Sequence, residues 1–320
     1  MHWILGGGQM KLAFNLLNTG LGNNGGSRTI ILCQQTLEKL GHICDIVGSI
    51  DNFTWFKHKK ITRRAPQDLD AIVATACTTI NSTLSISAKK KAWYIRGHEE
   101  WVMPGAKLGK LYNNLNLLNI ANSEGLKQII GIYGAGAEVI YQGMDFDWWQ
   151  DKELRPNKKT RIGSLYNTMK TKRWYDFVKL SELLPKNKYE FVAFGSKPYD
   201  AEFLTEYIQN PTSEELCDLY SSCHMWFAPT TKEGLHNVPM EAAMCGCLVV
   251  CSDHPMNGMV FDYAFDKTAM IYESENLDHA VKLIKKPDWT LVKNMQNYIK
   301  KNIGTREDNM KKLVSLLEEV

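Results

Sequence analysis

The 320-residue sequence contains no long hydrophobic run. Because a transmembrane helix needs about eighteen or more consecutive apolar residues, the sequence predicts none. The apolar segment near the N-terminus, Trp3 to Leu5, is far too short to be the core of a signal peptide. Both absences favour a cytoplasmic location.

The sequence also has little net charge. Its 38 basic and 35 acidic side chains give only +3, which argues against a protein that binds nucleic acid. Residues 1–150 carry fifteen basic and eleven acidic residues, and the excess lies in two clusters, Lys57–Arg64 and Lys89–Lys91. Solvated loops are the simpler interpretation of these clusters. The alternative is an anionic acceptor or a weak peripheral contact with a membrane surface.

The cysteines form no zinc motif. Eight are present, but Cys245 and Cys247 are separated by one residue rather than two, and no second pair accompanies them. Most of the eight lie within apolar strand or helix patterns, which is typical of reduced core residues in a cytosolic protein. The sequence therefore predicts no bound metal.

The most informative stretch runs from Phe227 to Cys251. Residues 223–228 predict a strand, Pro229 ends it, and a helix is predicted to begin at about Asn237 after a polar loop. Residues 248–250 then predict another buried strand. This order of strand, loop, helix and strand is that of a βαβ unit in a parallel sheet.

Two carboxylates bracket the loop and the start of this helix. Glu233 lies where the loop bends, and Glu241 lies about one turn into the helix, so both can face one ligand over the helix N-terminus. A helix N-terminus favours phosphate, and carboxylates accept hydrogen bonds from vicinal hydroxyls. The arrangement suits a nucleotide-sugar. The alternative is an ordinary βα turn with two incidental glutamates.

The same residues resemble the donor site of glycosyltransferase family 4 and its GT-B relatives. The usual family form is E-G-[FL]-G-x-x-x-x-E-A-x-A-x-G-x-P-V-V, and this sequence departs from it at His236, where Gly is usual, and at Leu248, where Pro is common. The resemblance assigns Glu241 to the ribose and Glu233 to the transferred sugar. The other donor-binding residues that it implies are Gly25, Gly26, Gly195, Gly234, Leu235, His236, Asn237 and Val238.

The N-terminal half resembles the family as well. Gly25 and Gly26 open a predicted helix, and they match the family loop that lies beneath the donor phosphate and the acceptor. A predicted strand over 92–95 leads to His98, and ligands of such sheets bind at the carboxyl ends of strands. In family members a His or an acidic residue in this loop often touches donor or acceptor, which makes His98 a candidate catalytic residue. The alternative is a solvated loop histidine.

The leaving diphosphate of such a donor requires cations. Family members usually supply an Arg and a Lys after the first strand of the second domain. Here Ser164 replaces that Arg, so the predicted cations are Lys172 and Arg173. The alternative is an ordinary pair of surface cations before a helix. Asp145 and Asp147 form an Asp-x-Asp sequence that is predicted to be a structural part of the linker element rather than a metal site.

The order of elements agrees with the family from Met10 onward. The sequence therefore predicts an α/β protein with the GT-B fold, in which two Rossmann-like domains carry parallel sheets that face a central cleft. Residues 10–150 are expected to form the acceptor domain and residues 151–304 the donor domain. Residues 305–320 are expected to form a helix that packs back toward the first domain.

The resemblance implies a retaining, metal-independent hexosyl- or deoxyhexosyltransferase that needs no cofactor. It would move a sugar from a nucleoside diphosphate-sugar to a hydroxyl of a glycan or glycoconjugate. The predicted catalytic residues are Glu233, His98, Lys172 and Arg173. Two alternatives stay open: a nucleotide-sugar 2-epimerase of the same architecture and a non-catalytic carbohydrate-binding protein.

Overall fold

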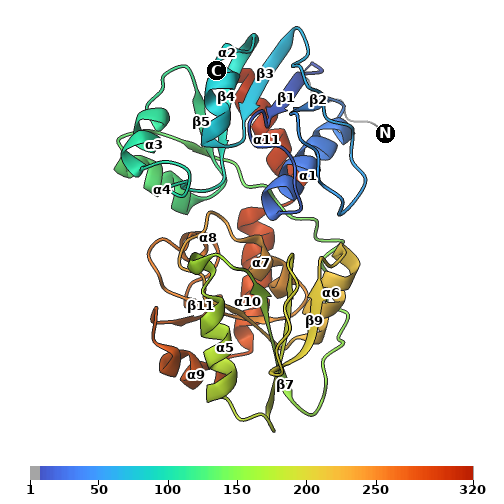
Figure 1. Cartoon of the computed structure of the whole chain (residues 1–320), viewed down its shortest axis with the longest axis vertical. Helices are drawn as coiled ribbons and strands as arrows, with labels where there is room; N and C mark the ends of the chain where they lie inside the picture. Colours follow the sequence, from blue (N-terminus) through green and yellow to red (C-terminus); the bar gives the residue numbers. More distant parts are fainter. Residues whose placement is uncertain (1–7, 320) are drawn as a thin grey trace. The chain divides into compact units, whose positions relative to one another are not determined.

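The computed structural model describes residues 8–319, which form two compact units (Figure 1). Residues 1–7, which include the N-terminal apolar segment, lie outside the described residues. The first unit runs to Gly143 and takes up the chain again at Thr305, and the second is the continuous segment Met144–Gly304.

The first boundary thus falls at Gly143 rather than after residue 150. The segment that follows it packs against the second unit, where the Cys217 thiol donates to the carbonyl oxygens of Trp148 and Gln150. The Trp149 ring also lies against the Tyr220 ring, with 5.7 Å between the centroids. These contacts fix residues 148–150 as part of the second unit.

A six-stranded parallel sheet with the order β2-β1-β3-β4-β5-β6 forms the centre of the first unit. The order reverses between β1 and β3, and ligands of such sheets bind beyond the carboxyl ends of strands at that point. The strands are β1 (Lys11–Asn15), β2 (Ile43–Val47), β3 (Leu69–Ala74), β4 (Ala88–Ile95), β5 (Leu118–Ala121) and β6 (Glu138–Val139), and the α-helices are α1 (Gly25–Lys39), α2 (Ile80–Ser85), α3 (Gly105–Tyr112), α4 (Glu124–Ile132) and α11 (Arg306–Glu319).

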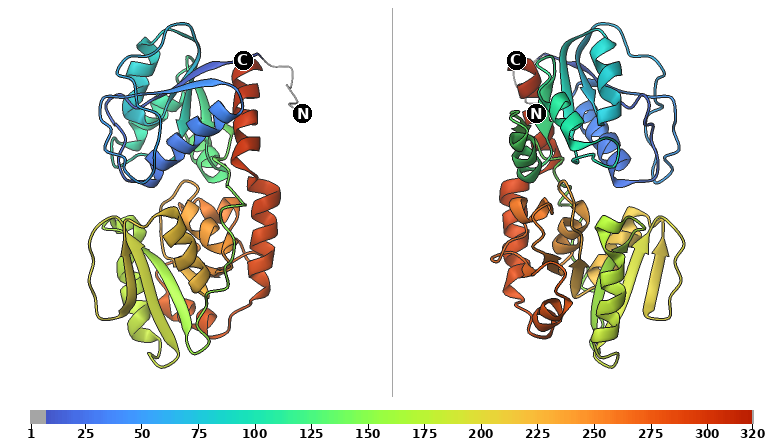
Figure 2. Two further views of the ribbon diagram at one scale, coloured as in Figure 1. Left: turned by 90° about the vertical axis from the view of Figure 1, so that its right-hand side faces the viewer. Right: turned by 60° about the vertical axis from the view of Figure 1, so that its left-hand side comes forward.

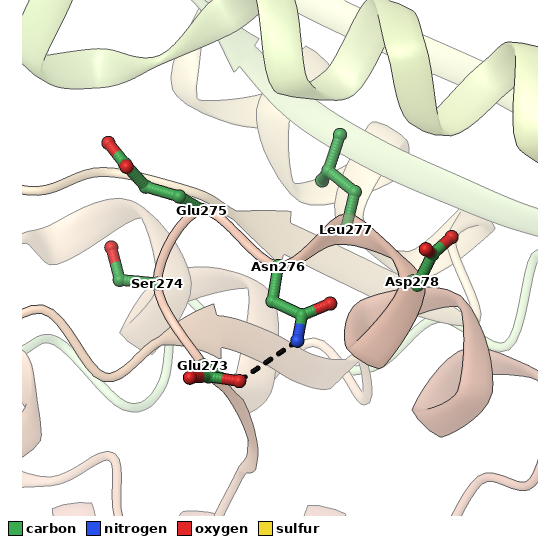
Figure 3. A pocket seen from close by; sticks show the side chains of 6 residues that line it. All are labelled: Glu273, Ser274, Glu275, Asn276, Leu277 and Asp278. Atoms are coloured by element: carbon green, nitrogen blue, oxygen red, sulfur yellow. Dashed lines mark hydrogen bonds between the residues drawn. The ribbon is translucent and has the colours of Figure 1, made fainter.

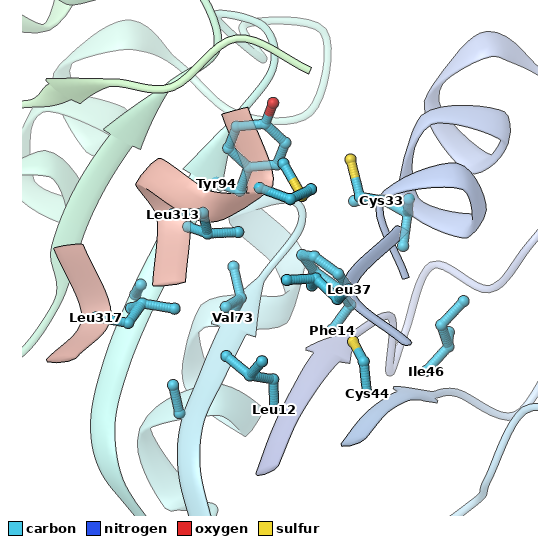
Figure 4. Packing of buried hydrophobic residues seen from close by; sticks show 14 of the residues in the cluster. Leu12, Phe14, Cys33, Leu37, Cys44, Ile46, Val73, Tyr94, Leu313 and Leu317 are labelled. Atoms are coloured by element: carbon cyan, nitrogen blue, oxygen red, sulfur yellow. The ribbon is translucent and has the colours of Figure 1, made fainter. Parts of the chain in front are cut away.

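Helix α11 closes the core of the first unit. It lies beside α1 and covers the sheet (Figures 1 and 2). Figure 4 shows Leu313 and Leu317 of α11 packed with Leu12, Phe14 and Val73 of the strands. The last helix of the chain is therefore an integral part of the first hydrophobic core.

The second unit contains another six-stranded parallel sheet, with the order β12-β11-β10-β7-β8-β9. Its order reverses between β7 and β10. The predicted α/β class with two parallel sheets is confirmed. The strands are β7 (Thr160–Tyr166), β8 (Tyr189–Gly195), β9 (Leu204–Gln209), β10 (Met225–Ala228), β11 (Leu248–Ser252) and β12 (Met270–Tyr272), and the α-helices are α5 (Trp174–Leu183), α6 (Ser213–Ser222), α7 (Asn237–Met244), α8 (Met259–Asp262), α9 (Leu277–Lys285) and α10 (Thr290–Tyr298), which continues as a π-helical turn over Ile299–Ile303.

Aromatic packing holds α5 onto the middle of this sheet. The Phe177 ring of α5 stacks on Phe227 of β10, and Phe227 stacks on Tyr272 of β12, with centroid distances of 6.1 and 5.5 Å. Ser164, which stands where the family usually has Arg, is buried and donates a 2.9 Å hydrogen bond to the carbonyl oxygen of Phe227. Ser164 therefore ties β7 to β10 at the point where the strand order reverses.

Candidate active site

The loop between β10 and α7 is held rigidly from one side. The Glu233 amide donates to the Met256 carbonyl oxygen at 3.2 Å, and the Gly258 amide donates to the Glu233 carbonyl oxygen at 3.3 Å. Gly258 is required for this approach, because a Cβ there would collide with the Gly234 carbonyl oxygen. The loop after β11 thus fixes the backbone that carries Glu233.

Glu233 forms a partly buried ion pair with Lys172 from the loop after β7. The Lys172 Nζ donates to Glu233 Oε1, and the Thr230 hydroxyl lies 3.1 Å from the same oxygen. The two loops are also joined by a 2.8 Å hydrogen bond from the Thr231 amide to the Thr171 carbonyl oxygen. Because β7 and β10 flank the reversal of strand order, the pair occupies the position where such sheets bind ligands.

The environment keeps Glu233 ionised. Burial by itself would raise the pKa of its carboxyl group, but the His236 ring, the Lys172 ammonium and the hydrogen bonds from Lys172 and Thr230 together hold that pKa below its ordinary value. A carboxylate at this site can accept hydrogen bonds from a ligand, although its Oε1 already has a cation beside it.

His236 is buried next to this pair. Its side chain is 7% exposed, and its Nε2 lies 3.7 Å from Glu233 Oε1. Burial is the main reason that the pKa of the ring falls to about 4; the Glu233 charge raises it and the Lys172 charge lowers it. Neither ring nitrogen has a hydrogen-bond partner among residues 8–319. The ring is therefore neutral near pH 7, and its polar atoms are available to a ligand.

Helix α7 begins at Asn237, as predicted, and places Glu241 one turn in. The Glu241 carboxylate is buried and accepts a 3.3 Å hydrogen bond from the Tyr220 hydroxyl of α6. The Asn237 Oδ1 atom is also buried and accepts no hydrogen bond from residues 8–319. Leu235 packs in the core, whereas Val238 is half-buried. Glu233, His236, Asn237 and Glu241 thus all lie in the loop before α7 or in the first turns of this helix.

Arg173 does not share the environment of Lys172. Its Nε donates to Asp176 Oδ2 at 2.6 Å, and its Nη1 donates to Glu275 Oε1 at 2.7 Å. The two neighbours separate because Arg173 has a left-handed backbone, with φ 50°, between the short helical turn and α5. The structure therefore places only Lys172 of the two predicted cations beside Glu233.

Gly195 ends β8, and the strand's carboxyl end is crowded by tyrosines. A Cβ at Gly195 would lie 2.6 Å from the Tyr207 hydroxyl and 2.9 Å from the Tyr166 carbonyl oxygen. The Tyr166 and Tyr199 rings pack nearby in a tilted arrangement, with 4.3 Å between their centroids. Glycine is thus needed here for packing at the strand end.

In the first unit, Gly25 and Gly26 form the start of α1, where the Asn24 side chain accepts from the Ser27 amide at 2.9 Å. A Cβ at Gly26 would lie 2.8 Å from the Arg96 guanidinium. Arg96 donates to the carbonyl oxygens of Gly26 and Thr75 at 2.6 and 2.9 Å. Arg96 is not among the residues predicted from the sequence, although its position directly after β4 marks the ligand-binding edge of a parallel sheet.

His98 is buried rather than solvated. Its Nδ1 lies 3.0 Å from the Tyr112 hydroxyl, and its Nε2 lies 3.3 Å from the Tyr133 hydroxyl and 3.2 Å from Glu100 Oε1. These partners come from α3, from the end of α4 and from the loop after β4. They hold the ring in place, and the catalytic role of His98 stays a prediction.

Two further features bear on ligands. A shallow cavity of about 460 Å³ lies along the loop between β12 and α9 and is lined by Glu273–Asp278 (Figure 3). Its three carboxylates oppose an anionic donor, so it is not the donor site.

Within residues 8–319, no three His, Cys, Asp or Glu side chains gather as metal ligands. Asp145 instead accepts a 3.3 Å hydrogen bond from the Trp148 amide.

The basic clusters are partly neutralised. Lys59 pairs with Glu38 and Asp45, and Lys89 pairs with Asp70. Over the described part of the chain, every helix is too short or too polar to cross a bilayer.

Several solved structures share this architecture. The sucrose-phosphate synthase of Thermosynechococcus elongatus superposes with a TM-score of 0.78 at 12% identity over 97% of this chain and 99% of that one. A glycosyltransferase from Rickettsia africae superposes with a TM-score of 0.75 at 14% identity, over 97% of this chain and 98% of that one. Anabaena HepE in complex with UDP superposes with a TM-score of 0.70 at 12% identity, over 97% of this chain and 100% of that one. The two parallel sheets therefore define the GT-B class.

The family follows from the sequence of the second unit. Residues 145–302 match the family described as Glycosyl transferases group 1, so the second unit is a group 1 glycosyltransferase domain. No curated protein sequence gives a significant match to the chain.

Proposed function

We propose that the chain is a retaining glycosyltransferase that moves a sugar from a nucleoside diphosphate-sugar to a hydroxyl of a glycan or glycoconjugate, without a metal ion. The observation that carries this proposal is the partly buried Lys172–Glu233 pair at the reversal of strand order, next to the start of α7. A cation, a carboxylate and the first-turn N–H groups of a helix are the three partners that a diphosphate bonded to a sugar requires.

Each group has a distinct role in this proposal. Glu241 accepts hydrogen bonds from the ribose, and Glu233 contacts the transferred sugar. Lys172 and the backbone around Asn237 and Val238 hold the diphosphate. Arg173 is ion-paired with Asp176 and Glu275, and it positions the loop that carries Lys172.

The chemistry follows from these placements. The bond between the sugar C1 and the diphosphate oxygen breaks, and its electron pair passes to the diphosphate, where the Lys172 charge stabilises it. The acceptor oxygen bonds to C1 on the same face, and its proton passes to a phosphate oxygen. The Glu233 carboxylate stabilises the positive charge that the sugar ring develops. His98 is assigned to the acceptor side, where it positions the loop after β4.

A uridine donor is the first to test, because the structure of the similar HepE protein was solved with UDP-glucose as well as with UDP. Calorimetry should show UDP or another nucleoside diphosphate binding to the wild-type chain. Glu241→Ala should weaken this binding by roughly 10²-fold, since it removes two hydrogen bonds to a charged group. Glu273→Ala, an exposed carboxylate of the acidic cavity, is the matched control and should bind as the wild type does.

Glu233→Gln separates the second carboxylate from the first. It should lower kcat, while nucleoside diphosphate affinity stays equal or rises, because Lys172 is released to the phosphates. Absence of binding by every nucleoside diphosphate would contradict the proposal. Release of the sugar without an acceptor would indicate an epimerase instead, and NMR of the product linkage would test retention.

A further inference from the structure

We infer that His236 and Glu233 together form a subsite for one hydroxyl group of the transferred sugar, and that His236 thereby determines which donor sugar is used. The inference rests on the proposed function, since it requires the sugar of the donor to lie beside Glu233. It adds a role for the residue at which this chain departs from the common family sequence.

The distance between the two groups matches a bridge through one oxygen atom. His236 Nε2 and Glu233 Oε1 are 3.7 Å apart, which is too long for a direct hydrogen bond. An oxygen that lies to the side of the line joining these two atoms can be about 2.8 Å from each of them. Both ring nitrogens are buried without a hydrogen-bond partner among residues 8–319, and buried polar atoms are rarely left unpaired.

The chemistry of the two groups selects a hydroxyl. The Glu233 carboxylate can only accept, whereas the neutral His236 ring offers one donor nitrogen and one acceptor nitrogen. A group between them must donate to Glu233 and accept from the ring, which a sugar hydroxyl does. A phosphate or carboxylate would be repelled by Glu233, so this subsite belongs to the sugar and not to the diphosphate.

The backbone indicates that the ring is kept for a purpose other than stability. His236 has φ 44°, in the left-handed region where glycine is favoured and a larger side chain is strained. The Tyr263 hydroxyl holds it there by donating to its carbonyl oxygen at 2.6 Å. Strain of this kind is typical of functional positions.

The test measures how much the sugar adds to binding. UDP and UDP-glucose are the first probe pair, GDP and GDP-mannose the second, and each Kd is measured by calorimetry for the wild type and for His236→Ala, His236→Asn and His236→Gly. His236→Ala should lower the ratio of nucleotide Kd to nucleotide-sugar Kd about tenfold, while the nucleotide Kd changes by less than about twofold. His236→Asn should retain part of the ratio, because Asn tolerates a left-handed backbone and carries a donor and an acceptor.

Deoxy analogues of the sugar identify the hydroxyl. One analogue should bind the wild type about tenfold more weakly, and the same analogue should weaken binding to His236→Ala by a smaller factor, because only the hydrogen bond to Glu233 is left to lose. His236→Gly should keep a melting temperature at or above that of the wild type, since glycine relieves the strain.

Three outcomes would overturn the inference. One is an unchanged ratio in His236→Ala, as expected if only water occupies the gap. The second is a parallel loss of UDP and UDP-glucose affinity, and the third is a lowered melting temperature in all three variants. A wild-type chain that binds no nucleoside diphosphate would instead refute the proposed function, and the inference with it.

Discussion

Lys172→Met should destabilise the second unit more than a surface substitution would. The Lys172 and Glu233 side chains are 18% and 13% exposed, so removal of the cation leaves a carboxylate largely buried and unpaired. Breaking a buried pair in this way costs about 3–5 kcal/mol, and the partial exposure favours the lower end. For a unit of this size, about 3 kcal/mol corresponds to a fall of roughly 6–12 °C in Tm.

The loss of stability in Lys172→Met should depend on pH. In the wild type the pKa of Glu233 is held below its ordinary value, so its pairing stabilises the fold above the unfolded pKa, and this stability is lost as pH falls through the folded pKa. In Lys172→Met, the lysine charge and its hydrogen bond no longer lower this pKa, so the folded pKa of Glu233 rises while burial still opposes the charge. The variant therefore gains less stability than the wild type as pH rises through this range. The Tm deficit of Lys172→Met should therefore be larger at about pH 7.5 than at about pH 5.

The double variant Lys172→Met with Glu233→Gln is the control. It removes both charges and should recover most of the lost Tm, because no uncompensated charge stays buried. Thermal unfolding followed by circular dichroism at the two pH values measures all three proteins. A single variant within about 1 kcal/mol of the wild type, or a double variant no more stable than the single one, would refute the reasoning.

Three further predictions concern the same unit. Gly258→Ala should lower activity at least tenfold and stability by about 1–3 kcal/mol, because its Cβ collides with the Gly234 carbonyl oxygen. Gly131→Ala, which has open space around it, should not destabilise the protein, and equal effects of the two substitutions would contradict the structural role of Gly258. Arg173→Ala should lower the free energy of unfolding in urea by about 3–5 kcal/mol, because it leaves the buried Asp176 unpaired. Substitution of the exposed Lys179 by Ala should lower it by almost nothing, and similar losses in both variants would argue against a structural role for Arg173. Transfer activity should survive excess chelator and ignore added Mn²⁺ or Mg²⁺, and abolition by chelator with rescue by Mn²⁺ would show that the lysine does not replace a metal.

The sequence predicted the element that organises the second sheet. Pro229 ends β10, α7 begins at Asn237, and β11 begins at Leu248, because proline and apolar periodicity are local signals. Strands β9 and β12 were not predicted. β12 has only three residues, and β9 lies at the sheet edge with half of its side chains exposed, so neither has the buried apolar run by which strands are recognised.

The site was harder to predict than the fold. Lys172 and Arg173 are adjacent in sequence and were assigned one role, but the left-handed backbone at Arg173 directs the two side chains to different carboxylates. The pairing of Lys172 with Glu233 depends on β7 and β10 being neighbours, which follows from the strand order and not from sequence spacing. The burial of His98 likewise depends on Tyr112 and Tyr133, which reach it from later elements.

The return of the chain to the first unit at Thr305 has a consequence for synthesis on the ribosome. The second unit is one continuous segment, so it can fold as soon as Gly304 has left the exit tunnel. The first unit is translated earlier but lacks Met310, Leu313 and Leu317 of its core until the final helix emerges. The segment translated first is therefore completed last, and until then its apolar sheet face is a target for chaperones.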